Sequence, residues 1–163
     1  MIKDTVIRVG VVGDIHGNYE GLERVVERLG RIEMLLFTGD GYREIDKLTE
    51  TLRTPVVGVA GNCDLVTEYP AEQTLFLGDT KILLTHGHIY GVKNGLTRLG
   101  LAARAAGAQL VVFGHTHQPL VDNWQEINLL NPGSLSGERS YRGPSYGVIE
   151  VSPAGIKLSL ERL

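Results

Sequence analysis

The sequence of 163 residues contains a single cysteine, Cys63, so no disulfide can form within the chain. A lone thiol fits the reducing environment of the cytosol. The chain also has no excess of basic residues: 16 Lys and Arg stand against 19 Asp and Glu, and the formal net charge is −3. This balance gives no electrostatic reason to expect binding to nucleic acid.

Long apolar runs are absent as well. No segment approaches the roughly 20 apolar residues that a membrane-spanning helix needs, so no membrane partner is expected. The N-terminal stretch 1–13 carries Asp4 and Arg8 among its apolar residues, whereas the apolar core of a secretory signal is uninterrupted. We therefore expect a cytoplasmic protein without a signal peptide. Its length fits one domain over residues 1–163.

Strands alternate with helices over most of the chain. Strands are predicted at 5–13, 34–37, 55–60 and 110–113, with a hairpin over 74–85 that turns at Gly78-Asp79. Helices are predicted from about Asn18, over 44–52 and over 94–107. The tail differs, because strands at 126–131, 146–151 and 155–163 have few residues between them and should be antiparallel. The pattern predicts an α/β fold with a mixed sheet system.

Polar residues collect where the predicted strands end. All five histidines of the chain lie just beyond a strand, and Asp14, Asp40 and Asn62 occupy similar positions. One such residue would be an ordinary cap or a solvated side chain. Open α/β sheets, however, bind ligands outside the carboxyl ends of their strands. Five separate segments could therefore direct Asp, Asn and His toward one crevice.

The residue types in this crevice predict a metal site. His and Asp without matching cysteines suit Zn, Mn, Fe or Ni rather than a site built on thiolates. The candidates are also too many for one ion, whereas two ions that share one carboxylate would use them all. These seven candidate ligands are Asp14, His16, Asp40, Asn62, His86, His115 and His117.

The motifs occur in an order that resembles a known family. "GDIHGN", "GD", "GNCD", "THGH" and "GHTH" follow one another along the chain, and "NPGS" comes after them. The series resembles the calcineurin-like metallophosphoesterase superfamily and, more closely, its small single-domain YfcE-like phosphodiesterases. The resemblance runs from about Val6 to Val151. It implies a four-layer α/β/β/α sandwich, in which two mixed β-sheets pack face to face with helices outside.

The resemblance also assigns the ligands. Asp14, His16 and His117 are similar to the ligands of a first metal, and Asp40 to a carboxylate that bridges two ions. The ligands of the second metal, which are also the predicted catalytic residues, would be Asn62, His86 and His115. The amide of Asn62 suits this role, because its oxygen can bind metal while its NH₂ donates to a phosphate oxygen.

The implied activity is hydrolysis of a small phosphate diester by a hydroxide held between two divalent ions. Mn²⁺ or Ni²⁺ is expected first, with Fe, Zn and Co as alternatives. The same core would also suit a phosphomonoesterase or a nucleoside-polyphosphate hydrolase. A non-catalytic scaffold is a third hypothesis, because the retromer has a subunit with this fold. Small relatives often form dimers or tetramers, so a homodimer or homotetramer is possible.

One position departs from the wider superfamily. Many members have histidine after "GN", where this chain has Cys63, and that histidine assists the chemistry. Cys63 could support the ligands, act as a weak proton donor or simply pack, and packing is expected first, because free cysteine often behaves as a small buried hydrophobe. Asp64 is expected to support the ligands or a turn rather than bind metal. The roles of four further residues stay open: His88, Arg43, Arg139 and Arg142.

Overall fold

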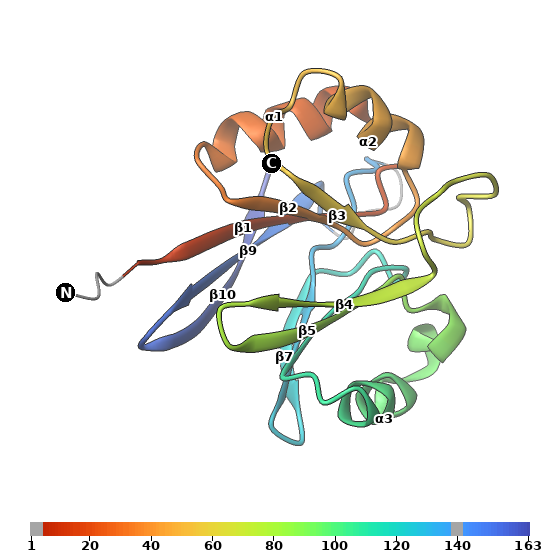
Figure 1. Ribbon diagram of the computed structural model, residues 1–163. Helices are drawn as coiled ribbons and strands as arrows, with labels where there is room; N and C mark the ends of the chain where they lie inside the picture. Colours follow the sequence, from red (N-terminus) through yellow and green to blue (C-terminus); the bar gives the residue numbers. More distant parts are fainter. Residues whose placement is uncertain (1–4, 138–141) are drawn as a thin grey trace.

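The computed structural model describes residues 5–137 and 142–163, which form two β-sheets packed face to face (Figure 1). The first sheet has the strand order β10-β9-β1-β2-β3, with β1 Ile7–Val12, β2 Met34–Phe37, β3 Val56–Gly58, β9 Ser145–Ser152 and β10 Gly155–Arg162. The second has the order β4-β5-β6-β8-β7, with β4 Glu72–Leu77, β5 Thr80–Thr85, β6 Leu110–Val112, β7 Leu120–Trp124 and β8 Ile127–Asn131. Both sheets are mixed, because β1-β2-β3 and β5-β6-β8 are parallel sets, whereas β9, β10, β4 and β7 pair with their neighbours in the antiparallel sense.

Helices cover the outer face of each sheet (Figure 1). The first sheet carries α1 (Tyr19–Leu29) and α2 (Tyr42–Thr49), and the second carries α3 (Thr97–Ala105). Two short 3₁₀ helices, η1 (His88–Tyr90) and η2 (Val92–Asn94), precede α3. The side chain of Asn18 accepts a hydrogen bond from Gly21 N and caps α1, as expected. The predicted four-layer α/β/β/α arrangement is confirmed.

The central strands contribute to two apolar clusters at once, because successive side chains of a strand point to opposite faces. In β2, Leu35 and Phe37 pack beneath α1 and α2, whereas Leu36 packs between the two sheets. In β6, Val111 packs beneath α3 and Val112 packs between the sheets. Strands covered on both faces read as continuous apolar runs, which explains the sequences "MLLF" and "LVVF".

In the C-terminal part the prediction misses one strand, and the expected direction of another is wrong. The pattern does not predict strand β7, an edge strand in which the exposed polar residues Asp122 and Asn123 interrupt the apolar run. Strand β8 pairs in parallel with β6 and is antiparallel only to β7. By contrast, β9 and β10 are antiparallel neighbours as expected, and β9 pairs with β1 in the same sense.

Candidate metal centre

The seven predicted ligands lie together at the edge where the parallel strands of both sheets end. They come from the loops that follow β1, β2 and β3 in the first sheet and β5 and β6 in the second. Ligand atoms of six of them form the groups Asp14–His16–His117 and Asp40–His86–His115, within each of which all atoms lie within 4.8 Å of one another, and the group His16–Asp40–Cys63 connects the two. The fold therefore brings together residues that are up to 103 positions apart in the sequence.

The first cluster joins the loops after β1 and β6. The Nε2 atoms of His16 and His117 are 3.2 Å apart. Oδ1 of Asp14 lies 3.2 Å from Nε2 of His117 and 3.6 Å from Nε2 of His16. Three potential metal-binding atoms thus converge on one point, and the two ring nitrogens among them come from different loops.

The second cluster is centred on His86, which is fully buried. Its Nε2 lies 3.0 Å from Oδ1 of Asn62, 3.2 Å from Nδ1 of His115 and 3.3 Å from Oδ2 of Asp40. The same Asp40 oxygen is 3.8 Å from Nε2 of His16, in the first cluster. Asp40 therefore lies between the two clusters.

Each of the two carboxylates has one oxygen fixed by the backbone and one left for other partners. Oδ2 of Asp14 accepts a hydrogen bond from His115 N at 2.9 Å, and Oδ1 of Asp40 accepts one from Cys63 N at 2.8 Å. Oδ1 of Asp14 is buried and makes no hydrogen bond with any described residue. A buried carboxylate oxygen costs free energy unless it is satisfied. These oxygens, surrounded by imidazole nitrogens, fit divalent cations.

Carboxylates and imidazoles at the site shift one another's pKa values. Burial alone would raise the pKa of Asp14, but the adjacent His117 and His16 hold it well below its ordinary value. Burial likewise opposes ionisation of Asp40, yet His86 lowers the pKa of that carboxyl. Burial lowers the pKa of His115 to about 4, with a contribution from the positive charge of His86. His115 is therefore a neutral ligand candidate at neutral pH.

The ring of His86 is oriented by the backbone of the loop after β2. Its Nδ1 lies 2.8 Å from the carbonyl oxygen of Thr38. A carbonyl can only accept, so Nδ1 carries the proton and donates. In the neutral ring this leaves the lone pair on Nε2, the atom that faces the other ligands. Asp40 and Asp14 raise the pKa of His86 despite its burial, so a cation at the site would have to displace a proton from Nε2 at low pH.

Five of the seven predicted ligands have a left-handed backbone. The φ angles are 46° at Asp14, 45° at His16, 59° at Asp40, 73° at His115 and 61° at His117. Such angles are uncommon for residues with a side chain and concentrate at functional sites. Neighbouring glycines give these loops room: a Cβ on Gly39 would lie 2.7 Å from Gly61 N and 2.8 Å from Nδ1 of His86.

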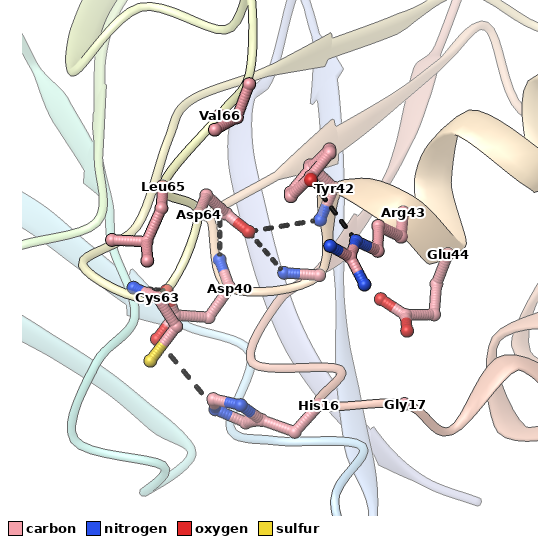
Figure 2. Close-up of a pocket in the computed structure, with 11 residues that line it drawn as sticks. His16, Gly17, Asp40, Tyr42, Arg43, Glu44, Cys63, Asp64, Leu65 and Val66 are labelled. Atoms are coloured by element: carbon pink, nitrogen blue, oxygen red, sulfur yellow. Dashed lines mark hydrogen bonds and ion pairs between the residues drawn. The ribbon is translucent and has the colours of Figure 1, made fainter.

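Asp64 supports Asp40 through the backbone, as Figure 2 shows. Its Oδ2 accepts hydrogen bonds from the N–H groups of Asp40 at 2.7 Å and Gly61 at 2.8 Å. Its Oδ1 accepts from Gly41 at 3.0 Å and Tyr42 at 3.2 Å. Four backbone donors thus converge on one carboxylate, and the expectation that Asp64 supports the ligands or a turn is confirmed.

The "NPGS" segment supports the first cluster from the second sheet. Nδ2 of Asn131 donates to the carbonyl of Gly114 and to Oγ1 of Thr116, within the loop that carries His115 and His117. Oγ of Ser134 donates to the carbonyl of Asp14 at 2.7 Å. The motif therefore ties two ligand loops together, a function that its sequence alone did not indicate.

The expectation that Cys63 is a buried packing residue is wrong, because Cys63 is exposed. Its Sγ lies within 4.8 Å of ligand atoms of His16 and Asp40. No sequence pattern indicates this exposure, since cysteine is usually buried.

The other residues with open roles differ in their relation to the centre. The ring of His88 is 5.3 Å from that of His86, and its buried Nδ1 has no hydrogen-bond partner among the described residues. Arg43 is exposed on α2. Arg142 is exposed, and its carbonyl accepts a hydrogen bond from Arg162 of β10. Arg139 lies outside the described residues.

A cavity of about 450 Å³ lies over the two clusters. Besides His16, Asp40, Asn62, His115 and His117, it is lined by Cys63, Lys93 and Thr116. Lys93 belongs to η2 and was not singled out in the sequence, because one lysine in a polar segment resembles any solvated side chain. Its position brings a positive charge to a cavity whose lining includes one carboxylate, that of Asp40.

Comparison with known proteins identifies the family. Residues 7–154 match the calcineurin-like phosphoesterase superfamily domain. The chain belongs to this superfamily. The probable metallophosphoesterase YsnB of Bacillus subtilis is 31% identical over 146 residues, covering 89% of this chain and 85% of YsnB. Phosphodiesterase YfcE of Escherichia coli K12 is 30% identical over 162 residues, covering 84% of each chain.

The solved structures agree. A predicted phosphoesterase from Streptococcus pneumoniae, whose crystal structure is known, superposes with a TM-score of 0.83 at 29% identity, covering 97% of this chain and 90% of that one. The resemblance seen in the sequence is thereby confirmed, and membership of a metallophosphoesterase family implies divalent metal ions. Among the described residues, no helix is long and apolar enough to cross a membrane.

Proposed function

We propose that this protein is a phosphodiesterase that works with two divalent cations. One would be held by Asp14, His16 and His117, the other by Asn62, His86 and His115, with Asp40 shared. The observation that carries the proposal is the position of Asp40, whose ligand atoms group both with His16 and with His86 and His115. A shared carboxylate offsets part of the repulsion between two cations about 3.5–4 Å apart.

The two cations would supply a water molecule of lowered pKa and positive charge opposite the phosphoryl oxygens. The protein's own residues would position the substrate. The amide oxygen of Asn62 faces His86, and one N–H of its NH₂ group donates to Sγ of Cys63 at 3.6 Å, so the second N–H would donate to a phosphate oxygen. Lys93 lines the same cavity and would attract the anionic substrate.

The donor set does not demand one metal. Imidazole and carboxylate ligands accept Mn, Fe, Co, Ni and Zn, and we propose Mn²⁺ or Ni²⁺ as the working ions. We also propose that diesters with good leaving groups are favoured over alkyl monoesters. Cys63 occupies the exposed position beside His16 and Asp40, where a histidine would be a better proton donor to a leaving alkoxide.

Metal removal tests the proposal. Chelator-treated protein should lose hydrolysis of a bis-aryl phosphate, and Mn²⁺ or Ni²⁺ should restore it as two ions bind per chain. Metal content by mass spectrometry and titration calorimetry would be measured beside turnover. Equal turnover in protein verified to be metal-free would exclude the mechanism, and full activity with one ion per chain would exclude the shared Asp40. A clear preference for alkyl monoesters would favour a phosphomonoesterase.

A further inference from the structure

A second cavity, of about 430 Å³, opens beside the candidate metal centre (Figure 2). It shares His16, Asp40 and Cys63 with the cavity over the clusters, so the two border on each other at these residues. The proposed reaction uses only the cavity over the clusters. A group attached to a phosphate bound there would extend into the second cavity, which we call the Tyr42–Leu65 cavity.

The two walls of the Tyr42–Leu65 cavity are chemically different (Figure 2). One wall is the segment after Asp64, where Leu65 is 87% exposed and Val66 is 79% exposed. The other is the first turn of α2, where Nε of Arg43 donates to Oη of Tyr42 at 3.2 Å. The guanidinium carbon lies 5.8 Å from the centroid of the Tyr42 ring. Aliphatic side chains and two planar groups thus line the same cavity.

The cavity is built by the same residue that supports Asp40. Oδ1 of Asp64 accepts hydrogen bonds from the N–H groups of Gly41 and Tyr42, and Leu65 directly follows Asp64. The aliphatic wall is therefore tied to the start of α2. Neighbouring exposed apolar side chains that line a cavity beside a site are typical of a surface that binds a ligand.

The charges around the cavity argue against a second phosphate. Glu44 lines the cavity together with Arg43, so the two opposite charges largely offset each other. A further cavity, which shares Tyr42 and Val66 with this one, is lined by Asp46 and Glu68. A second anionic group would lie among these carboxylates, whereas an uncharged apolar group would meet Tyr42, Leu65 and Val66.

We propose that the Tyr42–Leu65 cavity binds an uncharged planar aromatic substituent of the phosphoester, an aryl ring or a nucleobase. The proposal rests on the proposed function for the position of the phosphate. The ring would lie between the planar groups of Tyr42 and Arg43 and the aliphatic side chains of Leu65 and Val66. Aromatic and guanidinium planes are the surfaces on which bases stack, and aliphatic contact removes the other face of the ring from water.

The test is a set of dissociation constants measured by calorimetry on the metal-loaded full chain. Phenylphosphonate should bind about tenfold more tightly than methylphosphonate, because stacking of one ring contributes about that factor. Adenosine 5′-monophosphate compared with ribose 5-phosphate tells whether a nucleobase is accepted as well. Tyr42→Leu should abolish the preference for the ring, and Leu65→Ala should reduce it about fourfold, the worth of roughly one buried methylene group.

Leu101→Ala is the matched control, because Leu101 is an exposed leucine on α3, in the layer beyond the second sheet. It should keep the full preference for phenylphosphonate. Equal affinity for the two phosphonates in the parent protein would overturn the proposal, as would equal losses in Leu65→Ala and Leu101→Ala. If pyrophosphate binds more tightly than phenylphosphonate and Arg43→Gln removes that advantage, the cavity receives a second phosphate and the proposal is wrong. Failure to hydrolyse any ester, with the ring preference intact, would refute the proposed function and leave the aromatic subsite standing.

Discussion

The candidate site has a buried half and an exposed half, and the two are built differently. Asp14, Asp40, Asp64 and His86 are buried, and backbone groups hold each of them. Cys63, Leu65, Val66 and Lys93 are exposed at the mouth. Backbone groups of the fold therefore fix the geometry of the buried half, whereas the side-chain positions in the exposed half depend less on the fold. We infer that the buried half determines metal binding and stability, and that the exposed half determines which ester is cleaved.

The sharpest test of the buried half is Asp40→Asn. Asparagine can still accept the hydrogen bond from Cys63 N, so the free energy of unfolding of the metal-free variant should lie within about 1 kcal/mol of the parent's. The substitution removes the negative charge of the one ligand that is proposed to serve both ions. Turnover should fall by more than about 100-fold, since even indirect partners of metal ligands are worth about 10–100-fold.

Asp14→Asn is the comparison variant, because Asp14 belongs to the first cluster alone in the proposal. It should reduce binding of one ion more than the other, whereas Asp40→Asn should weaken both. Stoichiometry by calorimetry and elemental analysis separates the two cases. If Asp40→Asn retains two ions per chain and parental turnover, Asp40 is not the shared ligand.

Asp64→Asn tests the buried half without touching a predicted ligand. An amide accepts through one oxygen only, so two of the four backbone donors would face an NH₂ group. We expect the free energy of unfolding to fall by about 1–3 kcal/mol, the cost of unsatisfied buried donors. Metal affinity should fall about 10–100-fold as the Asp40 loop loosens.

Denaturant unfolding and metal titration of the Asp64 variant would be compared with Asp79→Asn. Asp79 is exposed in the turn between β4 and β5, and that change should be neutral. Loss of stability with unaltered metal affinity would mean that Asp64 holds α2 but not the ligand loop.

The buried half is also the part that the sequence foretold best. Strands buried on both faces must be apolar throughout, so their ends, and the ligands just beyond them, stand out. The family resemblance then supplied the four-layer arrangement, because no local pattern reports how two sheets face each other. Strand β7 lacked a signal because its three central residues are exposed and two of them, Asp122 and Asn123, are polar.

The exposed half was poorly predicted for a physical reason. Exposed residues are under no packing constraint that would mark their sequence, so Leu65, Val66 and Lys93 look like ordinary loop residues. Cys63 was expected to be buried because most cysteines are, yet the hydrogen bond from Cys63 N to Asp40 holds its backbone at the mouth of the site. Its neighbours in space, not in sequence, decide its environment.

Cys63→His tests the exposed half and carries the smallest expected effect. Ester cleavage must stabilise the departing oxygen: a nitrophenolate is stable near neutral pH, but an alkoxide needs a proton. Histidine, with an ordinary pKa of about 6.5 against about 8.5 for cysteine, is the better general acid near neutral pH. Because position 63 is exposed, the substitution should leave the free energy of unfolding and the metal content unchanged.

The ratio of monoesterase to diesterase turnover should rise about tenfold in Cys63→His. This gain is smaller than the factor of about 10²–10⁴ that a positioned general acid typically contributes. The gain should grow as the leaving group becomes poorer, which a series of phenols and alcohols of increasing pKa would show. Cys63→Ser is the control, because a hydroxyl cannot serve as an acid at neutral pH. Neighbouring cations lower the pKa of an imidazole, so the gain should be greatest at the acidic end of the active range. A variant that retains its metals and shows the parental dependence on the leaving group would place residue 63 outside the reach of the departing oxygen, and the exposed half would then act on the ester through contact alone.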